Sequence, residues 1–214
     1  MTVAADRVNR WVWVGILILA LLWLGPLPAL SRTAFSAHML LHLGVVALAA
    51  PVLALGLVRS GRRLRTGERF ATAAVLIFSL EMLVVWGWHL PALHEAAARQ
   101  VGIFVLQQLS FVVVGAAVWW LALSVRRRSE LVVTLLGFAL TLMHMTMLGV
   151  LLLLAPRLLY PAELCMGLFG FTELDDQRLG GVLMAAWGGG AYLLGGLVLG
   201  WRLISPGRAA EPTE

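Results

Sequence analysis

The chain has 214 residues, of which 61% are hydrophobic and 13% are charged, and its mean hydropathy is +0.91. This balance excludes an ordinary water-soluble domain and predicts that lipid surrounds most of the chain. The formal net charge of +5 comes from arginines that lie between apolar segments. It therefore indicates membrane topology and argues against a nucleic-acid partner.

Apolar segments recur along the whole chain, separated by short charged stretches. Each is near the roughly 20 residues that a helix needs to cross a hydrocarbon core. The segments cover residues 11–27, 36–58, 70–88, 101–125, 131–154 and 181–204. We expect an all-α fold in which residues 1–214 form a single domain, a transmembrane bundle of about six helices.

Two connections between apolar segments are rich in arginine. They are Arg59, Arg62, Arg63, Arg65 and Arg69 after the second segment, and Arg126, Arg127 and Arg128 after the fourth. The positive-inside rule places these loops in the cytoplasm, and both termini with them. The long, acidic loop over 155–180 is then expected on the extracytoplasmic side.

The second segment contains the run AHMLLH, in which His38 and His42 are four residues apart. On a helix both side chains lie on one face, about 6 Å apart along the axis. They could ligate one ion or cofactor, although helix packing or a hydrogen bond would explain the pair equally well. Met39 could add a thioether or simply pack in the core.

The third segment contains a carboxylate and ends at a histidine. Glu81 lies in the middle of the segment, where it must face the bundle interior, either in a functional role or protonated and hydrogen-bonded to a neighbouring helix. His89 closes the segment, and His94 is expected in the short loop beyond it. Each could be only a polar cap. The predicted topology places both at the same membrane face as His38 and His42.

The fifth segment contains the run MHMTM, with Met143, His144 and Met147 as candidate ligands. Met143 and Met147 share a helix face, whereas His144 is turned about 100° away from Met143, so the run cannot be one ligand set. Thioethers suit Cu(I) and imidazoles suit copper in general. Methionine is also a common filler of apolar cores.

Several runs with specific order and spacing extend over most of the chain. They are FSAHMLLHLGVVALAAPVLALG over 35–56, WGWHLPALHEAA over 86–97, the pair Trp119 and Trp120, RLLYP over 157–161 and LDDQRLGGVLM over 174–184. Together they resemble the membrane-embedded CtaG family of cytochrome c oxidase assembly factors. The fourth segment departs from the family pattern, because Gln108 in LQQLSF stands where members often have a histidine. Many members also have a seventh helix.

The resemblance implies a non-enzymatic, multi-pass protein of the bacterial cytoplasmic membrane that serves a haem-copper oxidase subunit, with a proposed role in copper delivery. The family pattern covers His38, Met39 and His42, then Trp88, His89 and Pro91, and finally Asp176, Gln177, Gly180 and Gly181. Asp175 and Asp176 are further candidates in the acidic loop. The MHMTM run is outside this pattern.

We therefore expect an extracytoplasmic copper site formed by His38, His42 and His89, assisted by Met39 or by the methionines around His144. Two other functions fit the same residues. Histidines on facing helices can ligate haem, as in a membrane redox protein, or they can be hydrogen-bonded in a scaffold that binds an oxidase subunit without metal.

Overall fold

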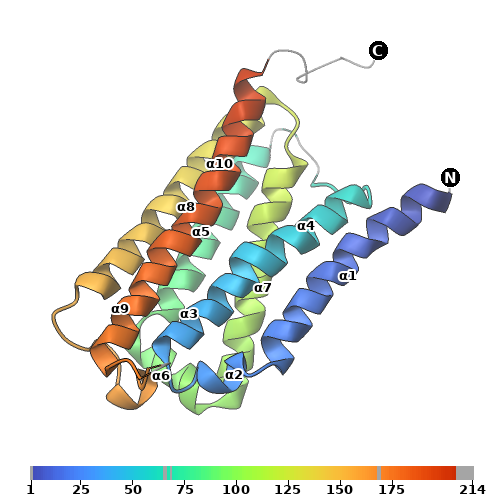
Figure 1. Ribbon diagram of the computed structural model, residues 1–214. Coiled ribbons are helices and arrows are strands. Elements are labelled where there is room, and N and C mark those ends of the chain that lie inside the picture. Colours follow the sequence, from blue (N-terminus) through green and yellow to red (C-terminus); the bar gives the residue numbers. More distant parts are fainter. Residues whose placement is uncertain (1, 65–66, 68, 168–169, 206–214) are drawn as a thin grey trace, which may run out of the picture.

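A computed structural model describes residues 2–64, 67, 69–167 and 170–205. Over these ranges the chain is helical without strands (Figure 1). The helices are α1 (Thr2–Leu24), α2 (Leu27–Leu30), α3 (Phe35–Gly44), α4 (Ala50–Arg59), α5 (Phe70–Trp88), α6 (Pro91–Arg99), α7 (Val101–Ser124), α8 (Arg128–Leu154), α9 (Glu173–Leu183) and α10 (Gly189–Ile204). Two π-helical turns, η1 (Val45–Ala49) and η3 (Met184–Gly188), join α3 to α4 and α9 to α10, and η2 (Ala162–Leu164) is a short 3-10 turn.

The described part of the chain contains apolar helices of the predicted length. Five are long and apolar enough to span a membrane, namely Phe35–Arg59, Phe70–Trp88, Val101–Ser124, Arg128–Leu154 and Glu173–Ile204. Helix α1 adds a shorter apolar stretch over Arg10–Leu24. The predicted all-α membrane bundle is confirmed. The helix that contains the last predicted segment begins earlier than that segment, at Glu173.

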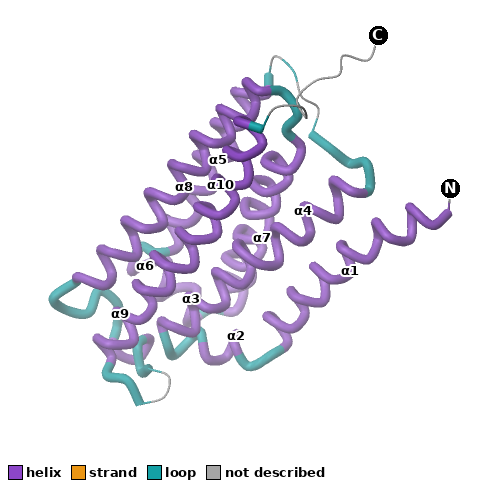
Figure 2. Tube along the Cα trace, turned by 45° about the horizontal axis from the view of Figure 1, so that its top comes forward, coloured by secondary structure: helices purple, strands orange, loops and turns teal. Residues whose placement is uncertain are grey.

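The long helices form a ring (Figures 1 and 2). Helix α7 packs between α4 and α5, α8 packs between α5 and the α9–η3–α10 segment, and α3 packs on α9. Helix α1 lies outside this ring against α4. The core consists mainly of aromatic and aliphatic side chains from α3, α5, α7, α8 and α10, including Phe35, Phe111, Phe138 and Tyr192.

The two ends of the bundle differ in charge. The start of α1, the end of α10 and the arginines of the α4–α5 and α7–α8 connections lie at one end, while α2, α6 and the α8–α9 connection lie at the other (Figure 1). Arg65 lies outside the described residues. The side chains that the sequence analysis assigned to one face therefore do share one end of the molecule.

The arginine-rich end is expected to face the cytoplasm. A reporter inserted between residues 62 and 69 should be active only as a cytoplasmic reporter, and one beside Glu163 only as an extracytoplasmic reporter. Paired fluorescent-protein and alkaline-phosphatase fusions measure both. The opposite labelling would contradict the orientation and would place the histidines on the cytoplasmic side.

Candidate functional site

Helix α3, which contributes two of the histidines, is held at its first turn by a carboxylate from α9. The first N–H groups of a helix have no partner within the helix. Asp176 supplies one: its Oδ2 accepts from the Phe35 N–H at 2.6 Å, and its Oδ1 accepts from the Ser36 N–H at 3.2 Å and from the Ser36 hydroxyl. Asp176 is fully buried. It is therefore a cap that fixes α3 against α9.

The residues that follow Asp176 fix the same junction. Gln177 accepts from the Leu159 N–H at 2.7 Å, which holds the α8–α9 connection. A Cβ atom on Gly180 would lie 2.4 Å from a ring atom of Phe35, so only glycine allows this close approach. Asp175 is surface-exposed and accepts from Thr172 at 2.7 Å. The DQRLGG run thus positions α3 and contributes no side chain to the histidine cluster described next.

Four histidines gather where α3, α5 and α6 meet, and we call them the histidine pocket. His38 and His42 come from α3, His89 follows the last residue of α5, and His94 lies on α6. Ring centroids are separated by 4.6 Å for His38 and His94, 5.6 Å for His38 and His89, and 5.4 Å for His42 and His89. All four are at most 4% exposed. The expectation that His94 lies in a loop was wrong, because Pro91 begins a helix that includes it.

Ring nitrogens in this pocket are buried without protein partners. They are His38 Nε2, both nitrogens of His42, His89 Nε2 and both nitrogens of His94. His89 Nδ1 lies 2.6 Å from the Val85 carbonyl oxygen. Because a carbonyl only accepts, Nδ1 must donate, and the neutral ring then has its lone pair on Nε2. His89 is thus oriented as metal-binding histidines are.

Aromatic side chains pack against the histidines. Phe111 packs 4.0 Å from His42, and Tyr160 packs 4.6 Å from His94, measured between ring centroids. The Tyr160 hydroxyl also donates to the His89 carbonyl at 2.8 Å. Tyr160 was not among the sequence candidates, although the RLLYP run contains it. Its ring and hydroxyl connect the α8–α9 connection to two of the histidines.

Burial keeps the imidazoles at the end of α5 and on α6 neutral. It lowers the pKa of His89 to about 4, against an opposing contribution from the hydrogen bond to Val85. It lowers the pKa of His94 to about 3, with a smaller contribution from the positive charge of a protonated His89. At neutral pH both rings therefore have a free lone pair, which is the form that a metal ion binds.

The rings share a pocket without being at ligand spacing. Within the described ranges, no three His, Cys, Asp or Glu side chains are placed to hold one metal ion. Nitrogens that share an ion lie roughly 3 to 4 Å apart, because metal to imidazole bonds are about 2 Å long. His38, His42 and His89 are therefore neighbours, and that they share one ion stays a prediction.

A second buried polar cluster lies deeper in the bundle. His144 Nε2 is 2.9 Å from Glu81 Oε2, and the Thr141 hydroxyl donates to the same oxygen at 3.3 Å. Glu81 lies eight residues before His89 on α5, about 12 Å along the axis. Glu81 is therefore hydrogen-bonded to a neighbouring helix, as one of the two interpretations expected, and His144 is separate from the histidine pocket.

The methionine candidates lie apart from the pocket as well. Met143 and Met147 are 59% and 47% exposed on the outer wall of α8, where lipid is expected. Met39 is buried, with its Cγ 3.2 Å from the position of a Cβ on Gly180. It packs toward α9. The structure does not group the two exposed methionines with any histidine of the pocket.

Gln108 is buried on α7 and is hydrogen-bonded. Its Oε1 accepts from the Trp23 indole N–H at 3.2 Å, and its amide donates to Gln107 at 3.4 Å. The side chain at the position where the resemblance implies a histidine therefore connects α1 to α7. Gln108 thus contributes to helix packing, and the histidine pocket consists of the four histidines alone.

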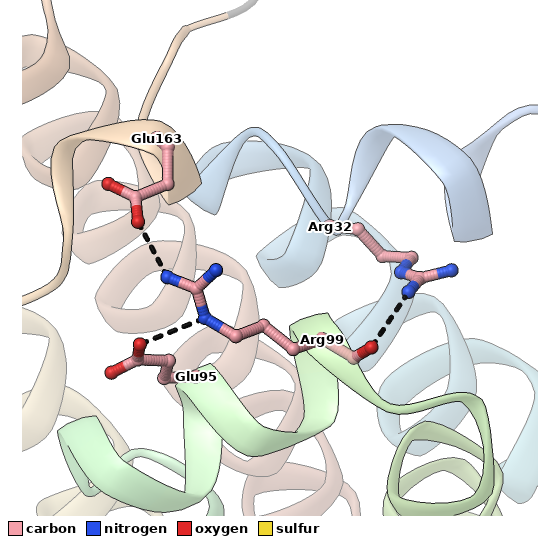
Figure 3. Close-up of polar contacts among 4 residues, drawn as sticks. All are labelled: Arg32, Glu95, Arg99 and Glu163. Atoms are coloured by element: carbon pink, nitrogen blue, oxygen red, sulfur yellow. Dashed lines mark hydrogen bonds and ion pairs between the residues drawn. The ribbon is translucent and has the colours of Figure 1, made fainter.

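Helix α6 is held by polar contacts at or near the surface (Figure 3). Arg99 contacts Glu95 at 2.9 Å and Glu163 at 2.6 Å. Arg32 donates to the carbonyl of Ala98 at 2.6 Å and to that of Arg99 at 3.3 Å. These contacts connect α6 to the segment after α2 and to the α8–α9 connection.

Comparison with known proteins gives one result for the whole chain. A family model described as the cytochrome c oxidase caa3 assembly factor (Caa3_CtaG) matches residues 2–205. No curated protein matches the chain, and no solved structure matches it. The family match includes every helix from α1 to α10, and therefore all four histidines of the pocket.

Proposed function

The chain belongs to the family of cytochrome c oxidase caa3 assembly factors, and we propose that it acts there by binding copper in the histidine pocket and passing it to an oxidase subunit. The observation that supports the copper proposal is the set of buried, unpartnered ring nitrogens on four neighbouring imidazoles. In this proposal copper is the ion that the protein transfers, and it is not a cofactor that the protein retains.

The energetic argument concerns polar groups in an apolar surrounding. A buried nitrogen without a hydrogen bond costs about 1–3 kcal/mol, and here several such nitrogens lie on adjacent rings. A metal ion shared by two or three imidazoles would offset this cost. Imidazole is a suitable ligand for copper, and the hydrogen bond from His89 Nδ1 to Val85 leaves Nε2 as the ligating atom.

Transfer by this route is ligand exchange. Incoming ligands of the oxidase subunit would replace imidazoles one at a time, so the protein needs neither a nucleophile nor a general base. The pocket lies at the end of the bundle opposite the arginine-rich loops. We place it on the outer side of the bacterial cytoplasmic membrane, facing an oxidase subunit.

Metal analysis tests the proposal directly. Protein purified in detergent, loaded with Cu(I) and washed free of unbound metal should retain an equimolar amount of copper and show no Soret band. The Met143→Leu and Met147→Leu variants should retain as much copper as the parent, because these side chains face outward. A Soret band in the purified protein would favour the haem alternative. Absence of both copper and haem would favour the scaffold.

A further inference from the structure

An apolar groove of about 590 Å³ lies on the outer wall of the bundle, where α4 and α10 separate. Trp119 of α7 and Phe138 of α8 form part of its lining, and Gly190 and Leu194 of α10 line one side. The opposite side contains Pro51 of α4. None of the four histidines of the pocket lines this groove.

One end of the groove is cationic. Arg202, in the last turn of α10, lines the groove and donates to the Val125 carbonyl at 3.0 Å. Arg63 donates at 3.4 Å to the carbonyl of Leu123, which is itself a groove residue. Partial burial lowers the pKa of Arg63, and the positive charges of Arg126 and Arg202 lower it further. The positive charges of Arg126 and Arg202 are thus near enough to act on the guanidinium of Arg63.

Acidic partners for this cluster do not occur among the residues that the structure describes. The ion pairs found there involve neither Arg63, Arg126 nor Arg202. Glu130 is the described carboxylate of the α7–α8 junction, and it accepts from the backbone N–H groups of Arg126 and Arg127 at 3.1 Å. Because each guanidinium has five N–H donors, the contacts to backbone carbonyls leave most donors available to an anion.

We propose that this groove binds an anionic phospholipid, with an acyl chain along the apolar lining and the phosphate against Arg63, Arg126 and Arg202. An apolar channel that ends in clustered positive charge at the membrane surface complements such a lipid in both parts. A transmembrane helix or a second copy of the chain would fill the apolar part but would leave the arginines without a counter-charge. The site is independent of the copper proposal.

Two substitutions separate the two halves of the site, and each has a matched control. A Cβ added at Gly190 meets no atom within 4 Å, so the backbone accepts a side chain here, and Gly190→Leu places one in the groove. Gly196 is equally open on the same helix and is not a groove residue, so Gly196→Leu is its control. Arg202→Gln removes one charge and the hydrogen bond to the Val125 carbonyl. Its control is Arg128→Gln, which also removes one charge and one hydrogen bond to a backbone carbonyl, that of Leu203 at 3.0 Å.

Delipidated protein in detergent is titrated with dioleoyl phosphatidylglycerol or dioleoyl phosphatidylcholine, and bound lipid is counted by native mass spectrometry. We expect tighter binding of the phosphatidylglycerol. Arg202→Gln should weaken it about fivefold, the effect of one basic residue at a membrane surface, and Arg128→Gln should not. Gly190→Leu should weaken both lipids, and Gly196→Leu neither.

Several results would overturn the proposal. Equal binding of the two lipids would remove the role of the arginines, as would equal effects of the two arginine variants. Equal effects of the two glycine variants would show that the lipid binds elsewhere. A dimer that Gly190→Leu converts to monomer would make the groove an interface between copies of the chain. Thermal unfolding of each variant in detergent checks that it is folded.

Discussion

Replacing His42 with alanine should remove copper binding while the bundle stays folded. Both ring nitrogens of His42 are buried without partners, so the substitution breaks no hydrogen bond within the protein. The cavity that it leaves costs stability, but removal of two unpartnered nitrogens offsets part of that cost. A site of three imidazoles loses chelation when one ligand is removed, and we expect affinity for Cu(I) to fall by more than about 100-fold, beyond the range for residues that only support a ligand.

Competition with a chromophoric Cu(I) chelator measures the affinity, and oxidase copper content and activity in cells measure the consequence. The His42→Ala protein should accumulate to the parental level yet leave the oxidase deficient. Met147→Ala, a truncation on the exposed wall, is the matched control and should behave like the parent. Parental copper affinity and full oxidase activity in His42→Ala would refute the role of this residue and favour a scaffold.

Replacing Asp176 with alanine should instead destabilise the fold. The carboxylate accepts hydrogen bonds from two backbone N–H groups and one hydroxyl at the start of α3, all of them buried. Hydrogen bonds to a charged group contribute about 1.5–3 kcal/mol each, so the loss should be on the order of 3 kcal/mol or more. Because α3 contains His38 and His42, copper affinity should fall as well.

Unfolding in mixed micelles of increasing denaturing detergent gives the change in stability. Asp175→Ala is the control, because Asp175 is a neighbouring carboxylate whose contacts are exposed, and it should change stability far less. If Asp176→Ala unfolds with the parental midpoint, the capping role assigned to the DQRLGG run is wrong.

The helices and the location of the pocket could be predicted because both depend on simple periodic patterns. Hydropathy identifies segments long enough to cross lipid, and alternation of spans places every second connection on the same side. His38 and His42 are four residues apart on one such span, and His89 ends the next. Because successive spans run in opposite directions, the start of one span and the end of the next lie at the same end of the bundle.

The errors come from short or polar helices, which hydropathy does not detect. Helix α6 has nine residues and mixes apolar with polar side chains, so hydropathy predicts a loop around His94. Helix α9 has three acidic residues in its first turn, so hydropathy does not reveal that the helix begins before residue 181. The orientation of Met143 and Met147 depends on which face of α8 packs inward, and an almost uniformly apolar helix gives no periodic signal for that face.

The exposed ion pairs of α6 should affect the rate at which the proposed copper ion enters and leaves the histidine pocket. Arg99, Glu95 and Glu163 are all about half exposed, so dissolved salt screens their attraction and water competes for their hydrogen bonds. We therefore expect this short helix to loosen while the long helices remain packed in lipid. Residence time of a bound ion should therefore be set by a local opening and should shorten as ionic strength rises, with the melting temperature of the bundle nearly unchanged.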